Sequence, residues 1–179
     1  MINHNLKTIF LHPAKCGGAS IRKVMFDRDM DPHISAAGHV KLVGKETWDT
    51  YFTFGFCRNP FDRVVSFYCF RQQLRKDKRF ADLTFDKFIN TIDRYKNLPE
   101  YRLQSTYFYY KNNPIDFIGR FENYQEDFQK VNNKLGTDFP LIHKKKTQRT
   151  HYSDYYNKQN INTIRNLYKE DLDNFNYDF

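Results

Sequence analysis

Apolar residues along this chain form short continuous runs that alternate with longer stretches in which they recur every three or four positions. The runs at residues 8–12, 51–57 and 115–119 have the length of strands, and unbroken apolar character is typical of strands buried on both faces of a sheet. Residues 31–44 and the basic stretch 144–152 are expected to be loops. Helical spacing marks the stretches at residues 19–27, 60–75, 84–93, 101–110, 123–135 and 160–175.

The alternation of strands and helices indicates an α/β fold, with a central parallel β-sheet flanked by helices. No repeat, low-complexity tract or linker interrupts the sequence, so residues 1–179 are expected to form one domain. No run approaches the roughly 18 apolar residues of a membrane span, and the run at residues 8–11 is too short for a signal peptide. Three cysteines without paired spacing favour a reducing compartment, so the expected location is cytoplasmic.

The formal net charge of +8 predicts an anionic partner. Nucleotides, nucleic acids and acidic glycans all meet that description, so charge alone does not choose among them. Aromatic residues make up 18% of the chain. Most are expected in the core, although those at residues 107–110 can also serve as platforms on which a sugar ring stacks.

The first apolar run ends in the segment Pro-Ala-Lys-Cys-Gly-Gly-Ala-Ser at residues 13–20. Gly17 and Gly18 allow the backbone to approach a ligand closely, and Lys15 places a charge beside it. The helix that follows directs its first amide groups and the positive end of its dipole at an anion. The segment is not a Walker A loop, because the lysine precedes the glycines. The alternative is an ordinary turn in which glycine serves geometry alone.

The second run leads into Arg-Asn-Pro-Phe-Asp-Arg-Val-Val-Ser at residues 58–66, where Pro60 suits the first turn of a helix. Arg58 can bind a phosphate with two N–H groups, and Ser66, about two helical turns later, can add a hydroxyl. The alternative is that Arg58 and Asp62 pair with each other as a solvated helix cap. Two such phosphate cradles in one chain predict a ligand with two separate phosphate groups.

Together these residues resemble the sulfotransferases, and most closely the sulfotransferase family 2 type, with its carbohydrate sulfotransferases and small bacterial relatives. Residues 13–20 are similar to the family's 5'-phosphosulfate loop, and residues 58–66 to its 3'-phosphate motif. Gly38-His39-Val40 is similar to the Gly-His-Val of heparan-sulfate uronyl 2-O-sulfotransferases. The family loop reads Pro-Lys-x-Gly, whereas here Ala14 stands between the proline and Lys15. The resemblance also covers residues 117–124, Tyr155-Tyr156 and residues 167–172, so it extends over almost the whole chain.

The resemblance implies a P-loop-NTPase-like sulfotransferase fold and the donor 3'-phosphoadenosine 5'-phosphosulfate (PAPS), which leaves as 3'-phosphoadenosine 5'-phosphate (PAP). The implied reaction is in-line transfer of the sulfuryl group to a carbohydrate hydroxyl, without a metal ion. Lys15 would also act in catalysis, by stabilising the leaving phosphate. The implied donor contacts are Lys15, Cys16, Gly17, Gly18, Ala19, Ser20 and Ile21 at the 5' end, Arg58 and Ser66 at the 3'-phosphate, and Lys146 and Arg149 in the late basic loop. The three adjacent lysines of that loop are equally consistent with a solvated face.

The implied reaction needs a general base, and histidine has the unperturbed pKa that suits neutral pH. His39 is the expected base, because it lies between the two motifs and matches the family's Gly-His-Val. His33 is the reserve. The alternative for His39 is a loop histidine on the surface or one whose hydrogen bonds are satisfied in the core.

Three other functions compete with this interpretation. Cys16 and Arg22 spell Cys-x5-Arg, the phosphate loop of cysteine-dependent phosphatases, but that function leaves residues 58–66 without a role. A nucleic-acid-binding module would rest on charge and aromatic content alone, and no known binding motif accompanies them. A nucleotide kinase is disfavoured by the missing Walker A loop and by the lack of an evident magnesium carboxylate. We therefore expect no nucleic-acid partner.

Overall fold

The computed structural model describes residues 1–26, 33–74, 83–96, 98–141 and 149–179. The chain divides into two compact units. The sheet unit comprises residues 1–57 and 104–144, and the helical unit comprises residues 58–103 and 145–179. None of the helices in the described ranges has the length and apolar character that a bilayer crossing requires.

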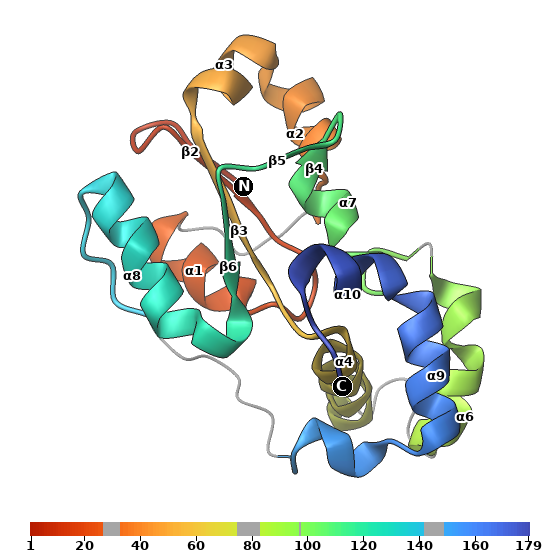
Figure 1. Ribbon diagram of the computed structural model, residues 1–179. Helices are drawn as coiled ribbons and strands as arrows, with labels where there is room; N and C mark the ends of the chain where they lie inside the picture. Colours follow the sequence, from red (N-terminus) through yellow and green to blue (C-terminus); the bar gives the residue numbers. More distant parts are fainter. Residues whose placement is uncertain (27–32, 75–82, 97, 142–148) are drawn as a thin grey trace. The chain divides into compact units, whose positions relative to one another are not determined.

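The sheet unit is built on four strands in the order β1-β2-β3-β6 (Figure 1). β2 (Thr8–Leu11), β3 (Phe52–Cys57) and β6 (Phe117–Arg120) run parallel to one another. β1 (Ile2–Asn3) pairs antiparallel with β2, so the sheet is mixed and the prediction of a wholly parallel sheet is wrong at this edge. The cause is the short connection between β1 and β2, since a few residues can reverse the chain but cannot make the crossover that parallel strands need.

Helices cover both faces of the sheet. α1 (Gly18–Met25) and α8 (Tyr124–Leu135) lie on one face (Figure 1). Their buried side chains pack on the phenylalanines of the strands. On the other face, the ring of Phe108 in α7 (Ser105–Phe108) lies over Gly55, where an added Cβ atom would be 2.4 Å from it. Glycine at this position therefore lets α7 approach the sheet closely. The core of the first face includes Phe10, Ile21, Met25, Phe54, Phe56, Phe128 and Val131.

Residues 31–44 contain a helix that the sequence does not predict. α2 (Ala36–Val43) begins after Ser35, whose hydroxyl accepts a hydrogen bond from the backbone N–H of Gly38 at 3.2 Å. A glycine inside a helix of only eight residues obscures the helical signal. α3 (Lys45–Thr50) follows directly and leads into β3.

Residues 101–110 are predicted to be one helix, but only α7 forms there. β4 (Tyr109–Tyr110) pairs with β5 (Asn113–Pro114) as a hairpin. The turn residues Lys111 and Asn112 both have positive φ, 49° and 65°, as a type I' turn requires. Tyrosine favours strands, and this preference prevails over the helical spacing.

The helical unit packs its helices around an aromatic core that includes Phe61, Phe67, Phe88 and Tyr101. The sequence predicts one helix over residues 160–175, whereas Tyr168 separates two helices and donates a hydrogen bond to the carbonyl of Tyr101 at 2.9 Å. The described elements of this unit are α4 (Pro60–Leu74), α6 (Phe85–Ile92), η1 (Asp93–Tyr95), η3 (Tyr152–Tyr155), α9 (Lys158–Leu167) and α10 (Lys169–Phe175).

Candidate functional site

The loop between β2 and α1 is the first predicted phosphate cradle. Two of its residues adopt left-handed backbone conformations, Lys15 with φ 69° and Gly17 with φ 82°. Turns of this kind gather successive backbone N–H groups on one side, as anion-binding loops do. For a lysine the conformation costs about 1–2 kcal/mol, and strain at a non-glycine residue is a pointer to function. The strain falls on the charged residue that the sequence singles out.

Both glycines of this loop are required by packing. An added Cβ at Gly18 would lie 2.0 Å from the ring of His12, and one at Gly17 would lie 2.8 Å from the ring of Tyr124. Packing alone therefore explains the two glycines, so they do not indicate a ligand. Support for an anion site comes from Lys15 and the backbone amides of the loop.

Tyr124 contacts the loop after β2 and is a residue of the candidate site that the sequence did not predict. It is buried at the start of α8, directly after the 3-10 turn η2 (Phe121–Asn123), and its hydroxyl donates to the carbonyl of Gly17 at 2.7 Å. Burial raises the pKa of Tyr124 well above its usual value, so the hydroxyl stays protonated and donating throughout the physiological pH range. Tyr124 thus holds the cradle in place, and the family resemblance of residues 117–124 was the available signal.

Cys16 lies in the same loop and is completely buried. Its Sγ atom is 3.1 Å from Oε1 of Gln104 and 3.6 Å from the carbonyl oxygen of Ala14. These oxygens are acceptors, so they favour the protonated thiol over the thiolate that a phosphatase needs as its nucleophile. The surroundings of Cys16 therefore disfavour the phosphatase alternative.

Two histidines meet beside this loop. Nδ1 of His33 lies 2.8 Å from the carbonyl oxygen of His12, and the two ring centroids are 5.0 Å apart. A nitrogen next to a carbonyl oxygen must carry the proton, so neutral His33 has its acceptor lone pair on Nε2. Sequence reasoning listed His33 as the reserve base and missed His12, whose ring packs against Gly18 at the start of α1.

His39 lies in α2 and is only 1% exposed. Its Nδ1 atom is 3.1 Å from the carbonyl oxygen of Ser35, and its Nε2 atom is 2.9 Å from the main-chain nitrogen of Met1. Burial first, and then the charge of the Met1 amino group, lower the pKa of His39 to about 4, while the contact with Ser35 opposes them. His39 is therefore neutral at pH 7, as a base must be, and both of its ring nitrogens have partners.

The second predicted cradle forms a charged cluster in the helical unit. Nε and Nη2 of Arg58 lie 2.9 and 2.8 Å from Oδ2 of Asp62, and the other carboxylate oxygen of Asp62 binds Arg149. The side chains of Arg58 and Asp62 are 8% and 15% exposed, so their pair is buried rather than a solvated cap. Two guanidinium groups thus converge on one carboxylate, although Arg149 and Asp62 are 87 residues apart in the sequence.

The start of α4 holds this cluster in place. Oδ1 of Asn59 accepts a hydrogen bond from the backbone N–H of Phe61 at 3.0 Å, which caps the helix one residue before Pro60. Ser66 is buried one turn beyond Asp62, on the same side of the helix. Lys146, the other predicted contact, lies outside the described residues.

The predicted site residues are divided between the two units. The sheet unit carries the contacts predicted for the 5' end together with both candidate bases, whereas Arg58, Ser66 and Arg149 belong to the helical unit. Ala19, Ser20 and Ile21 form the first turn of α1. Ile21 is part of the core, so only its backbone can reach a ligand.

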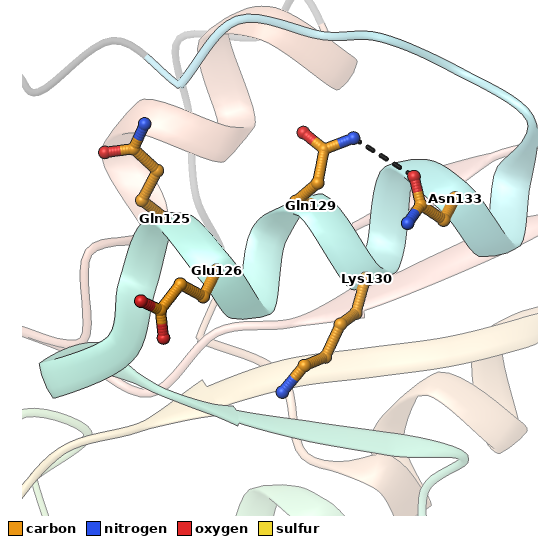
Figure 2. Close-up of a pocket in the computed structure, with 5 residues that line it drawn as sticks. All are labelled: Gln125, Glu126, Gln129, Lys130 and Asn133. Atoms are coloured by element: carbon orange, nitrogen blue, oxygen red, sulfur yellow. Dashed lines mark hydrogen bonds between the residues drawn. The ribbon is translucent and has the colours of Figure 1, made fainter.

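A hollow of about 620 Å³ follows the exposed side of α8. Figure 2 shows that its five side chains project from this single helix, where Gln129 donates to Asn133 at 3.1 Å. They carry no nucleophile and come from no second element, so this surface has the character of a solvated helix face. No group of three or more histidine, cysteine or acidic residues within the described ranges is arranged to hold a metal ion.

Comparison with known proteins identifies the family. Residues 1–178 match the model of the sulfotransferase family. An uncharacterized protein of Archaeoglobus fulgidus is 42% identical over 98 residues, which are 52% of this chain and 75% of that protein. No solved structure matches the chain. Because the family model extends over nearly every residue, including both predicted cradles, the chain belongs to the sulfotransferase family.

Proposed function

We propose that the protein is a PAPS-dependent sulfotransferase that transfers a sulfuryl group to a carbohydrate hydroxyl. The observation that carries the proposal is the convergence of Arg58 and Arg149 on Asp62. Asp62 fixes the plane of the Arg58 guanidinium, and this preorganisation is what two-point recognition of a phosphate requires. A 3'-phosphate is the feature that separates this donor from ATP and AMP.

The loop after β2 would hold the other end of the donor. β2 and β3 are adjacent and parallel, so their carboxyl ends lie at the same edge of the sheet, and Arg58 is the residue that follows β3 in the sequence. The rings of Tyr124 and His12 fill the space beside Gly17 and Gly18, so the loop would bind a phosphate oxygen with its backbone amides and Lys15. Bound PAPS would supply an activated sulfuryl group whose bond to the 5'-phosphate breaks as a bond to the acceptor oxygen forms.

Lys15 and the first amides of α1 would stabilise the negative charge that develops on the leaving 5'-phosphate. Such groups act without reorganisation only if they are held in place beforehand, and the hydrogen bond from Tyr124 to Gly17 does this for the loop.

The base that accepts the acceptor's proton would be His39 or His33. His39 is neutral, but an acceptor must displace the Met1 nitrogen to reach Nε2. His33 lies beside the cradle and presents Nε2 as its acceptor atom. Mutation of each histidine distinguishes the two assignments of the base. Replacement of the base with alanine should lower kcat by about 10²–10⁴-fold and leave PAP binding intact, whereas replacement of the other histidine should do neither.

The donor assignment is tested by thermal unfolding with PAP, ATP, AMP or buffer. PAP at about a hundred times its dissociation constant adds ~2.7 kcal/mol of stability. That gain should raise the unfolding midpoint by roughly 5–10 °C. The rise should be absent in Arg58→Ala and retained in Arg165→Ala, which removes an exposed arginine of α9. Equal stabilisation by all three nucleotides, or by none, would contradict the proposal.

A further inference from the structure

A cavity of about 240 Å³ opens in the sheet unit near the amino ends of the parallel strands. Thr53, the second residue of β3, lies in its wall. The predicted donor contacts follow the carboxyl ends of the strands instead. Cys57, the last residue of β3, comes four positions after Thr53, which at about 3.3 Å per residue places Thr53 roughly 13 Å from that edge. The cavity is therefore a separate place on the sheet unit.

Two aromatic side chains form one corner of this cavity. Trp48 of α3 and Tyr110 of β4 both line it, with ring centroids 6.1 Å apart and ring planes inclined by 63°. Both are half-buried, and neither belongs to the two hydrophobic cores of the described residues. Trp48 is the only tryptophan of the chain. An indole that packs no core and faces a cavity is suited to a ligand with an apolar surface.

Polar groups in fixed positions line the rest of the wall. Oδ2 of Asp116 accepts hydrogen bonds from both the backbone N–H and the hydroxyl of Thr53, each at 2.7 Å. Asp49 forms an ion pair with Lys45, and Asn113 adds an amide. The Nζ atom of Lys111 lies 5.6 Å from the ring centre of Tyr110.

The charges of this wall balance, because the two carboxylates of Asp49 and Asp116 line it together with the two lysines Lys45 and Lys111. A balanced wall does not select an anion, so the ligand should be neutral. The wall instead has carboxylate and amide groups that can bond to the hydroxyls of a ligand. Beside them lie aromatic rings that can pack against a C–H surface of the same ligand. A volume below the roughly 300–1,000 Å³ of drug-sized sites suits one small ring.

We propose that this cavity binds a single unit of a neutral saccharide. The apolar C–H face of the sugar would lie against Trp48 and Tyr110, and its hydroxyls would bond to Asp49, Asp116 and Asn113. The proposal goes beyond the donor site and does not depend on it.

Trp48 makes the proposal directly testable, because all tryptophan fluorescence of the protein arises at this cavity. The probes are the methyl glycosides of glucose, galactose, mannose and N-acetylglucosamine, titrated into the full chain. At least one should change the emission saturably, with a dissociation constant of the order of 1 mM, as expected for a small polar ligand with one stacking face.

Three variants test whether the fluorescence change comes from binding at the cavity. Asp49→Asn keeps the shape of the side chain and should weaken sugar binding by about tenfold, since it removes a charged acceptor. Its surface ion pair contributes little stability, so the variant should fold. Glu126→Ala, an exposed carboxylate of α8 in the same unit, should bind like the parent chain. Arg58→Ala should also keep the response, even where it abolishes PAP binding.

Three results would overturn the proposal. The first is no saturable response to any of the four glycosides. The second is a response that Asp49→Asn leaves unchanged. The third is a response to inorganic sulfate or phosphate alone, which would make the cavity an anion site.

Discussion

At the scale of single residues, two arginines of the second motif have different tasks although only four positions lie between them. Arg58 joins the cluster with Asp62 and Arg149, where a phosphate is proposed to bind. Arg63 is buried in the helical unit, and its Nη1 and Nη2 atoms donate to the carbonyls of Arg102 and Glu100 at 2.9 and 3.0 Å. A sequence motif does not separate the two, because both are arginines beside the same helix start.

Replacement of Arg63 with alanine should lower the free energy of unfolding by about 2–3 kcal/mol, since two carbonyl groups lose a charged donor. Urea denaturation measures the change. Lysine should not restore the loss, because an ammonium group cannot reach both carbonyls with fork geometry. The exposed Arg165 serves as the control, and its replacement with alanine should change the stability by less than about 0.5 kcal/mol. Equal effects at both positions would refute the structural assignment of Arg63.

His39 predicts a dependence of stability on pH. Its pKa is about 4 in the folded chain, below the value of 6.5 for an unperturbed histidine, so the unfolded chain binds more protons between these values. The contribution to stability is complete above about pH 6.5 and is lost as the pH falls toward 4. Between pH 7 and pH 5 the loss should be about 2 kcal/mol.

The measurement compares urea denaturation of the parent chain and of His39→Gln at both pH values. Glutamine does not titrate in this range, so the difference between the two chains isolates the histidine from the carboxylates. The variant should lose about 2 kcal/mol less than the parent chain on acidification. Parallel pH dependence in the two chains would show that His39 does not titrate as described.

At the scale of elements, the turn from β2 into α1 depends on close packing of backbone against a ring. Gly18→Ala should destabilise the protein by at least about 2 kcal/mol and weaken PAP binding, because its Cβ would lie 2.0 Å from the ring of His12. Gly136→Ala is the control for backbone strain without a clash. Unlike Gly18, Gly136 has positive φ (63°), but a Cβ there meets nothing within 4 Å, so only the backbone strain of about 1–2 kcal/mol applies.

The two effects are separated by measuring PAP binding as well as denaturation. Gly136→Ala should bind PAP like the parent chain, whereas Gly18→Ala should not. Normal PAP binding by Gly18→Ala would show that the cradle does not contribute to the nucleotide site.

Elements with a clear apolar pattern were predictable, whether long or short. α4 and α8 carry many consecutive residues of one period, and the four-residue strands β2 and β6 stand out as apolar runs. α2 and the hairpin of β4 and β5 were not predictable, because Gly38 obscures the period of α2 and the left-handed turn at Lys111 and Asn112 overrides the helical spacing of residues 101–110. The break between α9 and α10 at Tyr168 was not visible in the sequence either.

At the scale of the whole molecule, the residues proposed for the two ends of PAPS belong to different compact units. Binding of PAP should therefore slow amide hydrogen exchange in both, at the first turn of α1 and at the first turn of α4. Mass spectrometry of exchanged peptides, with and without PAP, measures this. The α8 peptides that cover Gln125–Asn133 provide the control, because their exposed face lies outside the proposed site. Protection in one unit alone would show that the two cradles do not share one ligand.

The family, the two candidate phosphate cradles and helices such as α4 and α8 follow from the order of residues alone, because each is encoded by neighbours in the chain. A glycine pair after an apolar run and an arginine before Asn-Pro are local signals, and they need no knowledge of what lies opposite. The sequence does not predict which residues these groups contact. The bond of Arg149 to Asp62 spans 87 residues and that of Tyr124 to Gly17 spans 107, so only the folded chain brings them together. Burial likewise depends on every element that packs on a side chain, and this is why the low pKa of His39 and the cavity beside Trp48 emerged from the tertiary structure.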